Sequence, residues 1–230
     1  MDTIMKKILL LMSLIISFPF ISCGDDKDEP ESPDNHKWVD LGLTSGTLWA
    51  TCNVGAHSPE EYGDYFAWGE TAPKEVYSWE TYEWCNGSWN TLTNYCTNSE
   101  FGTEDNKTEL EPENDAAYVN WGKSWRMPSP EQLQELLNNC IWTWTTLNGV
   151  NGQQVTGPNG ASLFLPVAGG RFDNSLNGVG SWGGYWSRTL YYYDPDRAYS
   201  LEFSSSGGRH LVRGIRHLGF PVRAVRVSQN

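Results

Sequence analysis

The sequence predicts one α+β domain over residues 36–230, with two short helices, several short strands and long loops. The chain has 12 Trp, 11 Tyr and 23 Gly, and from residue 36 onward its composition is that of a globular protein. No fixed-period repeat and no linker divides this region, whose length suits one hydrophobic core. Apolar residues recur at helical spacing in the first part, and alternate with polar ones in the second. Helices followed by strands are typical of the α+β class.

The clearest helix begins within the stretch WGKSWRMPSPEQLQELLNNC, residues 121–140. Pro128 disfavours helical backbone before it, so Ser129 can cap a helix that starts at Pro130, and Gln132 completes a capping box. The apolar stripe of this helix is Leu133, Leu136, Leu137 and Cys140. Its polar face is Glu131, Gln134, Glu135 and Asn138. We predict a half-buried scaffold helix whose carboxylates face solvent and do not act as general acid or base.

Shorter elements surround this helix. The stretch NDAAYVNWG predicts a second helix, capped by Asn114 and ended by Gly122. Residues 37–55, KWVDLGLTSGTLWATCNVG, predict a hairpin, because two alternating runs flank the turn residues TSG. Later alternating runs predict strands, and they are ASLFLPVAG (161–169), RAYSLEF (197–203) and PVRAVRV (221–227).

Residues 1–22 have the pattern of a signal peptide. Lys6 and Lys7 precede an apolar run that Pro19 interrupts and that is too short to span a bilayer comfortably. The following FISC and Gly24 resemble a bacterial lipobox, which implies that Cys23 becomes a lipidated N-terminus and the membrane anchor. Residues 23–35 are acidic and contain prolines, which predicts a flexible linker.

The net charge of −12 argues against a nucleic-acid partner, because so acidic a chain repels phosphates. Nearly all of the negative excess lies before Arg126, and the later part contains arginines but no lysine. We expect the late arginines to pair with early carboxylates rather than to form an anion site.

Four cysteines remain if Cys23 carries lipid, and an even number in an oxidising compartment predicts disulfides. Cys85 and Cys96 are natural partners, because they enclose a short loop rich in turn residues. Closing a loop of this length is worth about 3 kcal/mol in the chain-entropy description. Cys52 and Cys140 then either pair with each other or stay buried and reduced. Their spacing does not suggest a zinc site.

Seven segments together resemble the Fibrobacter succinogenes major paralogous domain family over nearly the whole globular region. They are DLGLTSGTLWATCNVGA, GDYFAWGET, DNKTEL, NDAAYVNWGKSWRMPSPEQLQELLNNCIWTW, GPNGASLFLPVAG, GGYWSRT and RGIRHLGFPVRAVRV. RMPSPEQL is also similar to a helix-leading motif of the formylglycine-generating enzymes. The resemblance implies a C-type lectin-like fold, in which two helices flank small, twisted antiparallel sheets. It also implies that the last strand returns beside the first and that long loops carry function.

The same resemblance implies a lipoprotein of the Bacteroidetes outer membrane that faces the cell exterior, for which the acidic linker is a suitable export signal.

Enzyme chemistry has little support in the residues. Formylglycine-type chemistry would require reactive cysteines late in the chain, and no cysteine follows Cys140. A Ser-His-Asp hydrolase is also poorly supported, because no GxSxG motif accompanies the four histidines. His210 and His217 are expected to be merely exposed or packed. Some members of the wider fold bind calcium, but EDNKTELEPEND (104–115) fits a solvated acidic loop better. We therefore predict no enzyme activity, no cofactor and no metal.

The aromatic stretch SWGGYWSRTLYYYDPDRA is the predicted ligand-binding surface. Aromatic faces beside polar groups suit stacking on sugar rings or anchoring a protein. Its candidate residues are Trp182, Tyr185, Trp186, Tyr191, Tyr192, Tyr193, Asp194, Asp196 and Arg197. Trp182 and Trp186, bracketed by glycines, fit the core better, whereas at least one of the three consecutive tyrosines should be exposed because strand side chains alternate. The function predicted is binding of a glycan or protein. The alternatives are a structural or tip subunit of a surface assembly and, more weakly, a hydrolase.

Overall fold

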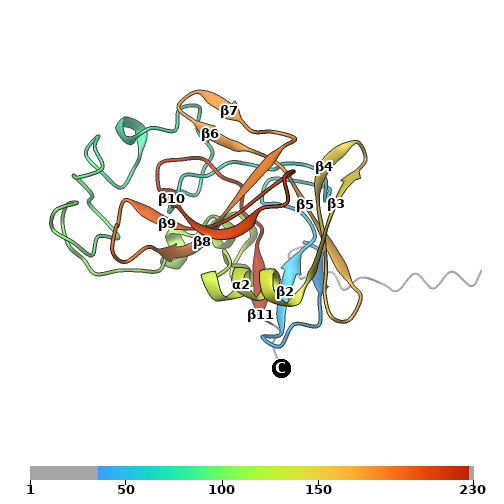
Figure 1. Cartoon of the computed structure of the whole chain (residues 1–230). Coiled ribbons are helices and arrows are strands. Elements are labelled where there is room, and N and C mark those ends of the chain that lie inside the picture. The colour runs from blue at the N-terminus through green and yellow to red at the C-terminus, as the bar shows by residue number, and fades with distance from the viewer. Residues whose placement is uncertain (1–35, 228–230) are drawn as a thin grey trace, which may run out of the picture.

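The computed structural model describes residues 36–227 (Figure 1). The predicted signal peptide (1–22), the lipidation site Cys23 and the linker (23–35) lie outside the described residues. Between residues 36 and 227, no helix is long and apolar enough to cross a membrane.

Small antiparallel sheets with few helices form the structure, which is compatible with the predicted α+β class and also with a mainly β class. The strands are β1 (Trp38–Asp40), β2 (Thr47–Ala50), β3 (Ile141–Leu147), β4 (Val150–Thr156), β5 (Ser162–Pro166), β6 (Gly170–Phe172), β7 (Ser175–Asn177), β8 (Trp182–Leu190), β9 (Arg197–Ser204), β10 (Arg209–Ile215) and β11 (Val225–Val227). Their sheets have the orders β1-β2-β11, β10-β9-β8, β3-β4-β5 and β6-β7. The helices are η1 (Trp79–Thr81), η2 (Pro112–Asn114), α1 (Ala116–Trp121) and α2 (Pro130–Asn139). Figure 1 shows α2 against the β8–β10 sheet and close to β2 and β11.

The predicted hairpin of residues 37–55 is confirmed as β1 and β2, with Trp38 opposite Ala50. The last strand, β11, returns to this sheet but pairs with β2, placing Val225 opposite Trp49. The expectation that the last strand lies directly beside the first is therefore wrong, because β2 separates them. The sheet still closes the domain by joining its two ends.

Helix α2 forms as its sequence predicts. The Ser129 hydroxyl accepts a hydrogen bond from the Gln132 backbone N–H, and the Gln132 side chain accepts one from the Ser129 N–H. Leu133 and Leu136 are buried. Glu135 lies on the partly exposed face as predicted, and its carboxylate has a further contact that was not predicted, because it accepts hydrogen bonds from Thr44 and Ser45 of the β1–β2 turn. Glu135 therefore clamps that turn to the helix.

Helix α1 ends near Gly122 as expected, but its cap is Asp115 rather than Asn114. Asp115 accepts from two backbone N–H groups of the first turn and forms a 2.8 Å ion pair with Arg126. The Asn114 side chain instead accepts a 2.6 Å hydrogen bond from the Tyr95 hydroxyl. The buried carboxylate takes the cap because it joins the helix to the segment that leads into α2.

The core consists of three clusters of buried side chains. One contains Trp68, Trp125, Trp186 and Phe220. The second joins the apolar stripe of α2 to Trp49, Tyr185, Leu201 and Phe203. The third lies under the long loops and contains Tyr77, Tyr82, Leu92 and Cys96. Burying this many large aromatic rings gives a chain with short elements its main stabilisation.

The prediction that late arginines pair with early carboxylates is confirmed for Arg188 and is wrong for Arg216 and Arg223. Arg188 pairs with Glu109 at 3.4 Å. Arg216 and Arg223 are fully buried, and their hydrogen bonds go mainly to backbone carbonyl oxygens. Arg223 also donates to the Asn53 amide oxygen at 2.9 Å. Burial lowers the Arg223 pKa, and the neighbouring Tyr185 opposes that shift.

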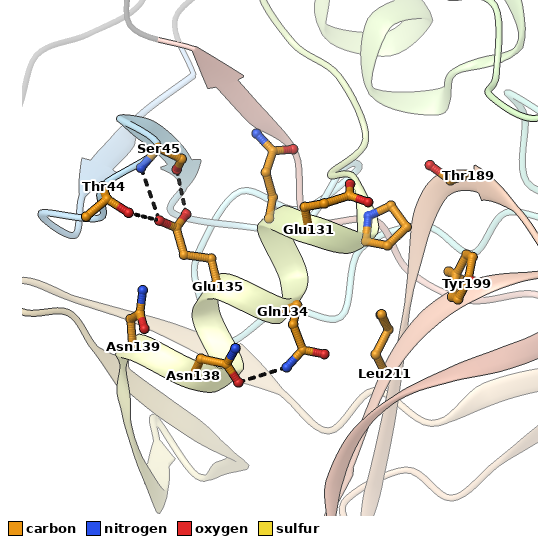
Figure 2. Close-up of a pocket in the computed structure, with 12 residues that line it drawn as sticks. Thr44, Ser45, Glu131, Gln134, Glu135, Asn138, Asn139, Thr189, Tyr199 and Leu211 are labelled. Carbon is orange, nitrogen blue, oxygen red and sulfur yellow. Dashed lines mark hydrogen bonds between the residues drawn. The ribbon is translucent and has the colours of Figure 1, made fainter.

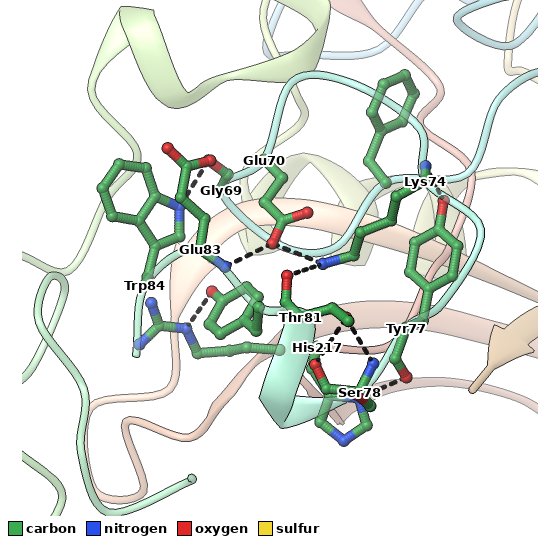
Figure 3. A network of polar contacts seen from close by, with 12 residues as sticks. Gly69, Glu70, Lys74, Tyr77, Ser78, Thr81, Glu83, Trp84 and His217 are labelled. Carbon is green, nitrogen blue, oxygen red and sulfur yellow. Dashed lines mark hydrogen bonds and ion pairs between the residues drawn. The ribbon is translucent and has the colours of Figure 1, made fainter. Parts of the chain in front are cut away.

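Long loops are held in place by buried polar groups rather than by regular structure (Figure 3). The Glu70 carboxylate accepts from the Lys74 ammonium at 2.8 Å and from the Glu83 N–H at 2.9 Å. Lys74 also donates to the Thr81 carbonyl oxygen at 3.0 Å. Because Glu70 is only 7 % exposed, this pair is weakly screened by solvent and fixes residues 70–83.

The cysteines at positions 52, 85, 96 and 140 are thiols in this structure. The Cys85 sulfur lies 3.1 Å from the Trp79 carbonyl oxygen, and the Cys96 sulfur lies 3.2 Å from that of Asn98. The predicted Cys85–Cys96 disulfide is not present in this structure, in which each thiol lies near a carbonyl oxygen. The pairing of the four cysteines stays a prediction that peptide mapping of the purified protein can test.

Candidate functional site

The three consecutive tyrosines lie in the turn between β8 and β9. Tyr192 is 55 % exposed and Tyr193 is 71 % exposed, which confirms that at least one of the three faces solvent. Tyr191 is half-buried and makes edge contacts with Tyr193 and Tyr199. We call Tyr191, Tyr192, Tyr193, Asp194, Arg197 and Arg213 the tyrosine surface.

Arg213 on β10 completes this surface. Its guanidinium lies 4.5 Å from the centre of the Tyr191 ring and donates a 2.8 Å hydrogen bond to the Tyr191 hydroxyl. Register explains the contact, because Arg213 is directly opposite Tyr199, which packs against the same ring. Arg197 donates to the Arg213 carbonyl oxygen at 3.3 Å. Asp194, Arg197 and Arg213 line a hollow of about 460 Å³ together with Leu211 and Val212.

Hydrogen bonds from a buried arginine and from a partly exposed threonine hold the backbone of the turn. Arg216 donates to the Pro195 carbonyl oxygen at 2.8 Å, and its own backbone N–H donates to the Asp196 carbonyl at 3.0 Å. The Thr97 hydroxyl donates to the Tyr192 carbonyl oxygen at 2.6 Å. The backbone below the rings is therefore fixed, which reduces the ordering entropy that a ligand would have to overcome.

Asp196 lies beneath the surface rather than on it. Its Oδ1 atom is buried with no hydrogen-bond partner among the described residues, and the Arg197 Nε atom is 3.9 Å away. Burial raises the Asp196 pKa, and the charge of Arg197 only partly offsets this. The Asp196 side chain is only 17 % exposed, so it is less accessible to a ligand than Tyr192 and Tyr193 are.

Three of the nine predicted residues belong to the core. Trp186 and Tyr185 are fully buried, and Trp182 is half-buried against Phe172 and Phe220. The prediction that Trp182 and Trp186 belong to the core is confirmed. The prediction that Tyr185 contacts a ligand is wrong, because its side chain is fully buried. Gly183 and Gly184 lie between these rings, close to Phe203 and Trp182, so little space is left there for other side chains.

A groove of about 760 Å³ runs along the polar face of α2 and was not predicted (Figure 2). Glu131, Gln134 and Asn138 form one wall, and Thr189, Tyr199 and Leu211 form the other. Sequence reasoning missed it because the facing wall comes from the β8–β10 sheet. Tyr199 and Leu211 reach this wall through the pairing of β9 with β10, and this pairing cannot be predicted from the sequence alone.

The acidic loop of residues 104–115 uses its side chains for structure. Asp105 accepts backbone hydrogen bonds from Tyr95 and Cys96, and Glu111 pairs with Lys107 at 2.7 Å. Within residues 36–227, no group of three or more His, Cys, Asp or Glu side chains could hold a metal ion. His210 is exposed and His217 packs on Trp79, as predicted for these two residues.

Comparison of the chain with protein families, with curated proteins and with solved structures found no match. The site must therefore be interpreted from its own chemistry. Two guanidinium groups and a carboxylate line a shallow hollow, exposed tyrosine rings lie on the turn that carries Asp194 and Arg197, and an amide-lined groove is lined in part by Tyr199. This arrangement offers stacking faces and hydrogen-bonding groups, and it suits recognition of a polar ligand.

Proposed function

We propose that this protein is a non-catalytic carbohydrate-binding module whose contact area is the tyrosine surface. The observation that carries the proposal is the pair of exposed rings, Tyr192 and Tyr193, on a turn whose backbone is fixed by Arg216 and Thr97. Tyrosine rings offer a large rigid contact area at low entropic cost, and they stack on the apolar faces of sugars. Asp194, Arg197 and Arg213 supply donors and acceptors for hydroxyl groups beside them.

We further propose that the chain is a lipoprotein of the Fibrobacter succinogenes major paralogous domain family with a C-type lectin-like fold. The motifs quoted above support the family, and the small antiparallel sheets, few helices and long loops are compatible with the fold. In this proposal, Cys23 anchors the protein in the outer membrane by lipid, and the acidic linker holds the domain at the cell exterior.

A glycan array probed with a soluble form that begins at Gly24 tests the binding function. We expect hits for a restricted set of glycans with the wild-type protein, and loss of those hits with Tyr193→Ala. Trp144→Ala removes an exposed ring of a different sheet, so it should leave the hits unchanged. An array with no hits for the wild-type protein would contradict the proposal.

The lipid anchor is tested separately in cells. Metabolic labelling with a palmitate analogue should mark the wild-type protein and should not mark Cys23→Ser. Cys140→Ser is the matched control, because it removes a thiol of the folded domain and leaves the lipobox intact. An unlabelled wild-type protein would refute the anchor without affecting the binding proposal.

One observation favours the alternative role as a subunit of a surface assembly. Strand β3 lies at the edge of its sheet, contains no charged residue, and exposes 71 % of Ile141 and 37 % of Trp144. An uncharged, β-branched edge is suited to pairing with a strand of another chain. Sedimentation analysis distinguishes the two roles, because the assembly role predicts self-association that Ile141→Lys abolishes.

A further inference from the structure

The α2 groove contains polar groups that the fold does not use. The Gln134 Nε2 atom donates to the Asn138 Oδ1 atom at 2.9 Å, which leaves one donor group on Asn138 and one acceptor on Gln134 facing the groove. Among the described residues, the Tyr199 hydroxyl and the Glu131 carboxylate have no hydrogen-bond partner. The groove therefore presents both donors and acceptors, and it also offers the half-buried surfaces of Tyr199 and Leu211.

The charge of the lining selects among polar ligands. The charged side chains in the lining are Glu131 and Glu135, and the lining includes no lysine, arginine or histidine. An acidic ligand would meet these carboxylates without a counter-charge. An uncharged, hydroxyl-rich ligand can bond to the amides and place its apolar face on Tyr199 and Leu211.

The two walls are joined, so that the groove exists without a ligand. Arg188 of β8 donates to the Gln132 amide oxygen at 3.3 Å and to the Met127 carbonyl oxygen at 3.2 Å. At the far end of α2, the indole N–H of Trp142 on β3 donates to the Leu136 carbonyl oxygen at 3.0 Å, which fixes the helix end and so the wall that α2 forms. A preformed groove of about 760 Å³ is within the range of about 300–1,000 Å³ for ligand sites.

The groove meets the tyrosine surface at Tyr199 and Leu211. Tyr199 contacts Tyr191 with ring centres 5.6 Å apart. Leu211 lines the groove and also lines the hollow beside Arg213. A ligand that lies on the exposed tyrosines can therefore continue along α2 without leaving the protein.

We propose that the α2 groove binds the continuation of an extended, uncharged oligosaccharide whose end lies on the tyrosine surface. This inference rests on the proposed function, because it takes the tyrosine surface to bind a carbohydrate and adds that this carbohydrate is extended and uncharged. It predicts that affinity rises with chain length and that groove variants affect only long ligands.

The test is calorimetry of the soluble form with neutral oligosaccharides of glucose, mannose and xylose, each as a dimer and a hexamer, and with a galacturonic acid hexamer. We expect at least one neutral hexamer to bind about tenfold or more tighter than its dimer, a difference of about 1.4 kcal/mol. The double variant Gln134→Ala and Asn138→Ala should remove that gain and leave dimer binding unchanged. Alanine favours helix at both exposed positions, so α2 should persist, which the melting temperature checks.

Gln154→Ala removes an exposed amide from β4 and is the control that should bind as the wild type does. Equal affinities for dimer and hexamer, with no effect of the double variant, would overturn the groove inference and leave the proposed function standing. Galacturonate binding as tight as that of the best neutral hexamer would overturn the assignment of an uncharged ligand. If no sugar binds at any length, both the inference and the proposed function fail.

Discussion

Arg216 is fully buried, and its guanidinium donates a 2.8 Å hydrogen bond to the carbonyl oxygen of Pro195, directly below the exposed tyrosines. The same group donates to the carbonyl oxygens of Asn94 and Tyr95 and lies 4.8 Å from the centre of the Trp68 ring. One side chain thus joins the candidate surface to a distant loop and to the aromatic core. We therefore expect that a change at this position affects both stability and any ligand binding by the tyrosine surface.

Replacing Arg216 with lysine should lower the free energy of unfolding by about 3 kcal/mol, because a buried hydrogen-bond network is broken. Lysine keeps the charge but lacks the planar fork that reaches several carbonyl groups at once. Urea denaturation measures the effect. The control Arg209→Lys changes an exposed guanidinium and should stay within about 0.5 kcal/mol of the wild type. Equal stability of Arg216→Lys and the control would show that the network does not hold the turn.

Tyr193→Ala should weaken glycan binding by about tenfold or more while the free energy of unfolding changes by less than about 0.5 kcal/mol. The ring is 71 % exposed, so its removal creates no cavity. Calorimetric titration with the strongest array hit measures binding, and urea denaturation measures stability. Tyr193→Phe keeps the ring and should retain most of the affinity. Unchanged binding by the alanine variant would exclude Tyr193 from the contact area.

Local signals explain what could be predicted from the sequence. Ser129, Pro130 and Gln132 identify the start of α2 because each acts within one helical turn. The exposure of a tyrosine followed from the run of three, although the run lies in a turn rather than on a strand. Such features depend on neighbours in the chain and are independent of how distant elements meet.

Long-range contacts explain what could not be predicted. The partners of Arg216 come from loops around residues 95 and 195, and no pattern in the chain links these loops. The α2 groove depends on the register between β9 and β10, which places Tyr199 opposite Arg213 and aligns Leu211 beside it. The core position of Tyr185 was missed because its neighbours in sequence are aromatic as well, and composition alone does not separate a ring in the core from a ring on the surface.

Asp196→Asn should stabilise the protein at neutral pH. Burial raises the pKa of this carboxyl in the folded state above its ordinary value of about 3.9, so the folded state prefers the neutral form. A raised pKa means that stability present at low pH is lost as pH rises through the folded value. Melting temperatures should therefore agree at pH 3 and favour the variant at pH 7. A less stable variant at pH 7 would show instead that the Arg197 contact outweighs the cost of burial.

Glu135→Gln should destabilise the protein at neutral pH and have no effect in acid. Burial opposes ionisation of Glu135, but hydrogen bonds from Ser45 and Thr44 outweigh it and lower the pKa in the folded state. A lowered pKa contributes stability above the ordinary value of about 4.3, and this contribution is lost as pH falls through the folded value. Melting curves between pH 2.5 and pH 7 should thus converge only at the acidic end. The control Glu100→Gln alters an exposed carboxyl and should track the wild type throughout. A gap that persists at low pH, where Glu135 is itself neutral, would mean that the amide disturbs the clamp sterically and that the charge of Glu135 does not stabilise it.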